Sequence, residues 1–138
     1  MNKAIDNLQG AMQKAMAGRP DIGGFPYLAE TLRAAGVKIN EWTLPSCQSL
    51  YITDYGPVVM QGQPLITDIR EVPTFNKSAV IHALRDDQTG KTTFPQFLAA
   101  IWHAGTTRYV VDFTTRQVTY FGCNGESYVE AYPEMKVD

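Results

Sequence analysis

The sequence predicts an α+β fold of about four helices and antiparallel β-hairpins. Segments with apolar residues at three- and four-residue steps, the pattern of amphipathic helices, alternate with short runs rich in β-branched and aromatic residues. The order helix, helix, strand, strand, strand occurs twice along the chain. With 138 residues, the chain has the size of one domain, and we expect residues 1–138 to share a single core.

Two helices open the chain. The first is predicted over 3–17, where the apolar stripe consists of Ile5, Leu8, Met12 and Ala15. The second begins at Pro26, whose fixed φ and missing N–H suit a first helical turn, and it ends at Gly36. Three strands follow, over 39–44, 47–53 and 57–61, with turn residues between them.

The second half repeats this order. A helix is predicted over 76–85, ended by the polar run at 86–90, and another follows with Thr93 as its N-cap and Gly105 at its end. Three further strands are predicted over 107–113, 116–122 and 126–132. Their turns lie at Thr114-Thr115 and around Asn124-Gly125.

The two Phe-Pro pairs, at 25–26 and 94–95, lie 69 residues apart, which is half the chain length. At this offset nine of 69 paired positions are identical, against roughly four expected from composition. The matches are Asn7 with Asn76, Phe25 with Phe94, Pro26 with Pro95, Ala35 with Ala104, Gly36 with Gly105, Gln48 with Gln117, Tyr51 with Tyr120, Gly56 with Gly125 and Pro64 with Pro133. They favour two repeats, 1–69 and 70–138, related by an approximate twofold. Independent convergence of helix caps on Pro and Gly is the alternative.

Side-chain alternation in the last three strands predicts a binding surface. A two-residue turn at Thr114-Thr115 directs Tyr109, Val111 and Phe113 into the core and Arg108, Asp112 and Phe121 outward. Taking 122–125 as the next turn places Glu126, Tyr128 and Glu130 on the same outer face. The predicted binding residues are therefore Arg108, Asp112, Phe121, Glu126 and Tyr128; an ordinary solvent-exposed or helix-covered face is the alternative.

Composition and motifs argue against several functions. The net charge is −2, without runs of either sign, so no nucleic-acid partner is expected. We expect a cytoplasmic protein with no membrane partner, because the N-terminus does not read as a secretory signal and no apolar run is long enough to span a bilayer. Cys47 and Cys123 are expected to be reduced thiols. No metal motif, cofactor motif or catalytic residue is identified, and His82 and His103 have no partners at ligand spacing.

The run at 97–133, FLAAIWHAGTTRYVVDFTTRQVTYFGCNGESYVEAYP, resembles the C-terminal signature of the YdfO/YbcV-like family of small bacterial and prophage proteins of unknown function. Some members of that family carry the label phage envelope protein. Segments 25–37 and 44–53 are also similar, and the most specific shared residues are Ala104-Gly105, Arg108, Tyr109, Asp112 and Tyr120. The resemblance implies a compact α+β domain with antiparallel strands, and it implies no reaction.

The sequence thus predicts a prophage-type accessory protein, a non-enzymatic module that binds an unknown protein or small ligand through the outer face of its C-terminal hairpin. The alternative is a small enzyme that uses Asp112 with Glu126 or Glu130 as acid and base. A homodimer is a further possibility, since Leu50, Ile52 and Val59 form an apolar face that something must bury.

Overall fold

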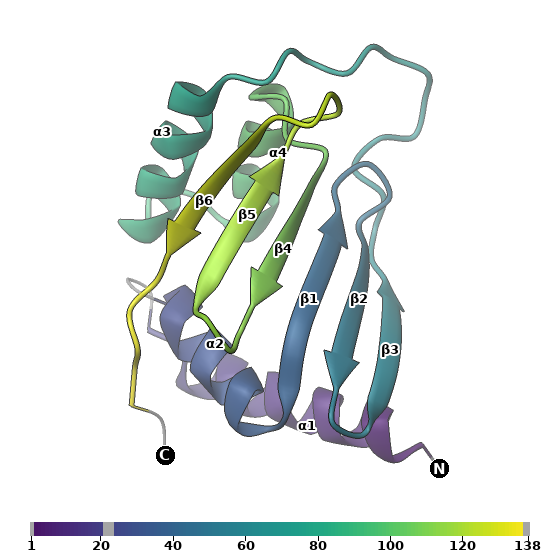
Figure 1. Ribbon diagram of the computed structural model, residues 1–138, viewed down its shortest axis with the longest axis vertical. Coiled ribbons are helices and arrows are strands. Elements are labelled where there is room, and N and C mark those ends of the chain that lie inside the picture. Colours follow the sequence, from purple (N-terminus) through teal and green to yellow (C-terminus); the bar gives the residue numbers. More distant parts are fainter. Residues whose placement is uncertain (1, 21–23, 137–138) are drawn as a thin grey trace.

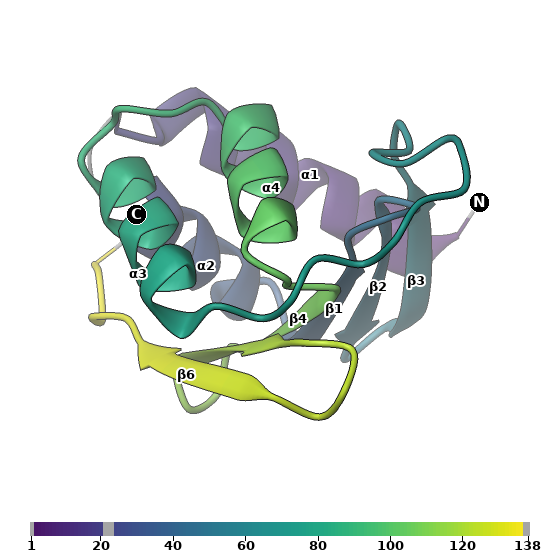
Figure 2. The same ribbon diagram turned by 90° about the horizontal axis from the view of Figure 1, so that it is seen from above.

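The protein consists of a helical layer and a sheet layer. The computed structural model describes residues 2–20 and 24–136. Four helices cover one face of a six-stranded antiparallel sheet, and they leave the opposite face bare (Figures 1 and 2). The predicted α+β fold is confirmed.

The first half contains α1 (Lys3–Gly18), α2 (Gly24–Ala34), β1 (Val37–Thr43), β2 (Gln48–Thr53) and β3 (Gly56–Gln61). The Asn2 side chain caps α1 by accepting a hydrogen bond from the Ile5 N–H. Leu8 and Ala15 of the predicted stripe are buried, whereas Ile5 is exposed.

The second half contains α3 (Lys77–Gln88), α4 (Phe94–His103), β4 (Arg108–Asp112), β5 (Gln117–Phe121) and β6 (Ser127–Ala131). Thr93 and Gln96 form a capping box at the start of α4, as the predicted N-cap requires. The predicted helix over 76–85 ended too early. The helix continues through Asp87 and Gln88 and stops at Thr89 and Gly90, the second of which has a φ of +77°.

The sheet order is β3-β2-β1-β4-β5-β6, so the halves join through antiparallel pairing of β1 with β4. Glu41 lies opposite Val110 in this ladder, and these residues are 69 positions apart. Left-handed residues also recur at this offset: Cys47 with Arg116, Gly36 with Gly105, and Gly56 with Gly125. These correspondences support the proposal of two repeats related by an approximate twofold.

The helices form two pairs. α1 contacts α2 and α3 contacts α4, and each pair packs on the sheet (Figure 2). The core between the layers includes Leu8, Val37, Val80, Ile101 and Val111, all almost fully buried. Of the helices that the structure describes, none is both long and apolar enough to cross a membrane.

Candidate functional site

Three of the predicted binding residues lie on the bare face of the sheet. β4 and β5 pair Arg108 with Phe121 and Tyr109 with Tyr120, the register that the sequence predicts. The Arg108 guanidinium carbon lies 3.8 Å from the centroid of the Phe121 ring, and Arg108 Nη1 lies 3.3 Å from Glu41 Oε1. Glu41 is a partner of Arg108 that the sequence did not reveal, because it comes from the first half of the chain.

Asp112 also faces outward, but its carboxylate closes a turn. Asp112 Oδ1 accepts hydrogen bonds from the backbone N–H groups of Thr114 (3.0 Å) and Thr115 (3.1 Å). Such side-chain-to-backbone bonds are typical of aspartate at turns. Asp112 therefore has a structural role in the hairpin.

The predicted orientation of β6 is wrong by one residue. Gly122 N–H donates to Glu126 O (2.9 Å), which leaves a three-residue loop at 123–125, and Phe121 pairs with Ser127 instead of Glu126. A one-residue shift moves every side chain of a strand to the other face. Tyr128 and Glu130 consequently point toward the helices, and the outer face of β6 carries Ser127, Val129 and Ala131.

This register also excludes the predicted acid–base pairs. Asp112 and Glu130 lie on opposite faces of the sheet, because Glu130 pairs with the inward-facing Val118. Glu126 lies near the Phe121 end of the hairpin, and its carboxylate accepts a hydrogen bond from Asn124 N–H (2.9 Å). Neither pair of carboxylates converges.

The cysteines and histidines have structural or solvent-exposed positions. Cys47 is buried and Cys123 is exposed, and both are free thiols. His82 Nδ1 lies 3.5 Å from Asp86 Oδ2 on an exposed face of α3, and His103 ends α4. Among residues 2–20 and 24–136, no group of three or more His, Cys, Asp or Glu side chains is placed to hold a metal ion.

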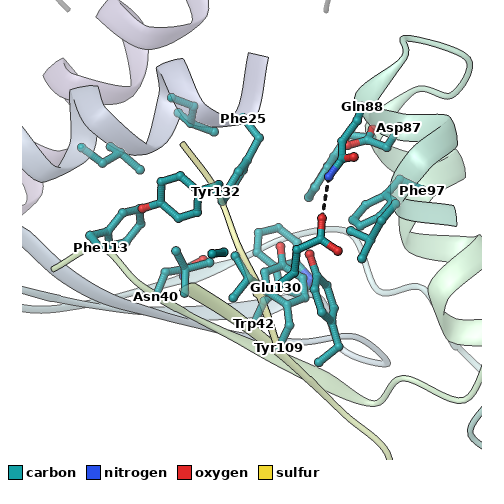
Figure 3. A pocket seen from close by; sticks show the side chains of 18 of the residues that line it. Phe25, Asn40, Trp42, Asp87, Gln88, Phe97, Tyr109, Phe113, Glu130 and Tyr132 are labelled. Atoms are coloured by element: carbon teal, nitrogen blue, oxygen red, sulfur yellow. Dashed lines mark hydrogen bonds between the residues drawn. The ribbon is translucent and has the colours of Figure 1, made fainter. Parts of the chain in front are cut away.

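A cavity of about 140 Å³ lies between the sheet and the helices. In Figure 3, Phe25 of α2 and Phe97 of α4 approach it from opposite sides, above Trp42 of β1 and Tyr109 of β4. Nine of the 21 described residues that line it are aromatic: Phe25, Trp42, Tyr51, Phe94, Phe97, Tyr109, Phe113, Tyr120 and Tyr132. The pocket therefore occupies the space where the two helix pairs meet above the sheet.

The aromatic rings of the wall pack against one another. The Trp42 and Tyr109 rings are stacked at 6.0 Å with an interplanar angle of 3°, and Phe94 meets Trp42 edge to face at 5.4 Å. Phe25 meets Tyr132 edge to face at 5.2 Å. Contacts of this kind hold aromatic rings in defined orientations, so the wall of the cavity has a defined shape.

Polar side chains occupy one side of the pocket. Glu130 accepts hydrogen bonds from Arg85 Nη1 (2.7 Å), Gln88 Nε2 (2.8 Å) and Tyr128 Oη (2.7 Å). Burial, the largest single influence, raises the pKa of Glu130, but the combined bonds from its three partners outweigh it and leave the pKa lowered. Glu130 is therefore an ionised group fixed between β6 and α3.

Asp87 is the second acidic group of the pocket. Burial raises its pKa, and the charge of Arg19, which also lines the pocket, opposes this shift. The sequence did not identify Asp87 as a pocket residue, because the predicted helix stopped two residues before it.

Two buried polar atoms of the wall have no hydrogen-bond partner among the described residues: Trp42 Nε1 and Tyr132 Oη. Buried donors are normally paired. Burial raises the pKa of Tyr132 to about 12 and raises the pKa values of Tyr109 and Tyr120 further. These phenols therefore stay neutral at physiological pH, and the wall carries no tyrosinate charge.

The comparison with known proteins names no activity. A family model described as "Protein of unknown function (DUF1398)" matches residues 13–130. Similar proteins include the uncharacterized proteins Rv2012 of Mycobacterium tuberculosis and Mb2035 of Mycobacterium bovis. Each is 54% identical over 136 residues, which cover 99% of this chain and 83% of the relative.

Proposed function

The chain belongs to the family described as Protein of unknown function (DUF1398), whose description names no activity, and we therefore propose a function from the geometry of this molecule: it binds a small, largely apolar molecule in the pocket between its sheet and its helices. The observation that carries this proposal is a cavity of about 140 Å³ with an aromatic wall. An engineered cavity of about 150 Å³ with an apolar lining holds benzene, so the expected ligand has about the size of one ring.

The energetic cost of the cavity supports this proposal. Empty volume enclosed in a core lowers stability by about 24 cal/mol for each Å³, so the cost for this partly open pocket is at most about 3 kcal/mol. Folded proteins are stable by only about 5–15 kcal/mol. A bound ligand would recover the lost contacts.

Chemical features of the wall narrow the class of ligand. Planar aromatic side chains favour a planar ligand that stacks or meets them edge to face. Asp87 and Arg19 bring both signs of charge to the pocket, and the charge of Glu130 is paired with Arg85, so neither a strongly anionic nor a strongly cationic ligand is favoured over a neutral one. We expect a neutral ring with a hydrogen-bonding substituent.

Ligand-observed NMR and thermal shift with benzene, phenol and indole test this function. We expect binding in the millimolar range or tighter and a rise in Tm with ligand concentration. Leu28 lines the pocket on α2 at the position 69 residues before Phe97, so Leu28→Phe adds a further phenyl ring to the cavity wall and fills part of its volume. This variant should weaken binding about thirtyfold, which corresponds to about 2 kcal/mol.

The matched control is Ile69→Phe, which adds a phenyl ring at a fully exposed position outside the pocket. We expect this control to bind the three probes as the unmodified protein does. The proposal is wrong if none of the probes binds, or if Leu28→Phe, folded by circular dichroism, binds them unchanged.

A second candidate function is protein binding through the bare face of the sheet, as the sequence predicted. Arg108 and Phe121 remain on that face, and the exposed Val129 of β6 joins them. Glu126, Tyr128 and Glu130 are no longer part of this proposal.

Three parts of the sequence-based prediction stay predictions: membership of the YdfO/YbcV-like family, a prophage origin and a cytoplasmic location. Screening the genomic neighbourhoods of DUF1398 genes for phage genes tests the origin.

A further inference from the structure

The bare face of the sheet, which we call the open face, carries exposed aliphatic side chains at both of its ends. The exposed fractions are 37% for Leu50, 39% for Ile52, 61% for Val59 and 49% for Val129. Leu50 and Val59 are directly paired across β2 and β3, so they form one continuous surface. None of the four described helices covers this surface (Figure 1).

From these observations we propose that the open face is the interface of a homodimer. This inference concerns the surface of the second candidate function and makes a second copy of the chain the protein that binds there; it does not depend on the ligand proposed for the pocket.

The size of the open face fits a stable dimer. Six strands at about 4.8 Å spacing and about five residues of about 3.3 Å each give a footprint of roughly 29 by 17 Å, or about 500 Å². Projecting side chains raise the accessible area above this flat value. A standard interface buries about 800 Å² for each partner, so most of the open face would be used.

Charge on the open face is complementary to a second copy of itself. Arg108 lies at one end of the outward row of β4 and Asp112 lies at the other end, with Val110 between them opposite Glu41. A twofold axis that runs across the strands through Glu41 and Val110 turns the second copy so that its Asp112 lies over Arg108. The same rotation places Leu50, Val59 and Glu41 over their own copies, and residues that face their own copies are characteristic of a twofold interface. The two Glu41 carboxylates that meet at the axis are each paired with Arg108 of their own chain.

The central charge pair is compatible with burial in this interface. Glu41 and Arg108 already pair within one chain at 3.3 Å, and the Phe121 ring packs against the guanidinium. Burying an ion together with its partner avoids the large cost of an isolated buried charge. The interface therefore combines two apolar ends with a paired centre.

Sedimentation velocity and native mass spectrometry of the full chain, from low to high micromolar concentration, test the proposal. We expect a species of twice the chain mass of 15.3 kDa. Val59→Lys combined with Val129→Lys introduces four lysines into the interface and should raise the dimer dissociation constant about 100-fold or more. Arg108→Asp should raise it about tenfold.

Ile69→Lys is the matched control, because Ile69 is fully exposed outside the open face. It should leave the dissociation constant unchanged, and all variants should keep the far-ultraviolet circular dichroism of the unmodified protein. A strictly monomeric chain throughout the concentration range would overturn the proposal, as would open-ended oligomers. An unchanged dimer in the double lysine variant would also overturn it.

Discussion

Gly105 has less room for a side chain than Gly36, Gly56 or Gly125, which also have a positive φ. Its φ is +92°, and a Cβ at this position would lie 2.4 Å from Phe75 Cα, a backbone atom that cannot rotate away. The neighbouring Ala104 O accepts a hydrogen bond from Asn76 N–H (2.8 Å) and so holds the two segments together. Glycine at 105 is therefore required both by backbone conformation and by close packing.

Gly105→Ala should lower the free energy of unfolding by about 3 kcal/mol or more, because it adds a backbone clash to the cost of a left-handed alanine. Gly125→Ala is the matched control. Gly125 has a φ of +88° with no atom within 4 Å of a Cβ, so its replacement should cost only about 1 kcal/mol. Urea denaturation measures both, and equal losses would contradict the packing argument.

The pKa of Glu130 gives a prediction of pH dependence. Because the folded pKa is lowered, the ionised carboxylate contributes stability that is present above its unfolded pKa of about 4.3 and is lost as the pH falls through the folded value. The Glu130→Gln variant has no titrating group at this position. The stability difference between the unmodified protein and this variant should therefore shrink between about pH 5 and pH 3.

Urea denaturation at several pH values measures this difference. Glu134→Gln is the control, because Glu134 is an exposed carboxylate four residues after Glu130. We expect its effect on stability to depend much less on pH. A difference for Glu130→Gln that stays constant through the acid range would show that its hydrogen bonds do not stabilise the ionised form.

At the scale of elements, the sequence predicts the starts of α3 and α4 closely, because the signals of a helix cap are local. Thr93 and Asn76 precede α4 and α3 and cap them through their side chains. The β6 register was missed because the turn was predicted as the four residues 122–125, whereas the structure closes the hairpin with a three-residue loop at 123–125. Glycine at a left-handed position completes the three-residue form, and contacts distant in sequence, such as Arg85 with Glu130, favour the observed register.

The capping box of α4 gives a prediction at this scale. Thr93→Ala removes the acceptor for Gln96 N–H and should lower the free energy of unfolding by about 1 kcal/mol. Thr115→Ala, at an exposed turn position, is the matched control and should change it by less than about 0.5 kcal/mol. Thermal denaturation compares the two, and a loss no greater than that of the control would show that the cap does not stabilise α4.

At the scale of the whole molecule, the pocket could not be predicted because its wall comes from segments throughout the chain. Asp87 and Gln88 reach it only because α3 is longer than the local sequence suggests. One signal was present: the identical pairs Phe25 with Phe94 and Tyr51 with Tyr120, found at the 69-residue offset, all line the cavity. Identical residues at matching positions of the two halves can thus mark a pocket that both halves line, as well as helix caps that both halves contain.

The sheet order has a consequence for folding. β1, β2 and β3 pair with neighbours in sequence, as do β4, β5 and β6, so each half can assemble its strands over short chain distances. Only the ladder between β1 and β4 requires segments about 70 residues apart to meet. The chamber between the helix pairs can close only when that ladder forms, so the feature proposed to bind a ligand is completed last.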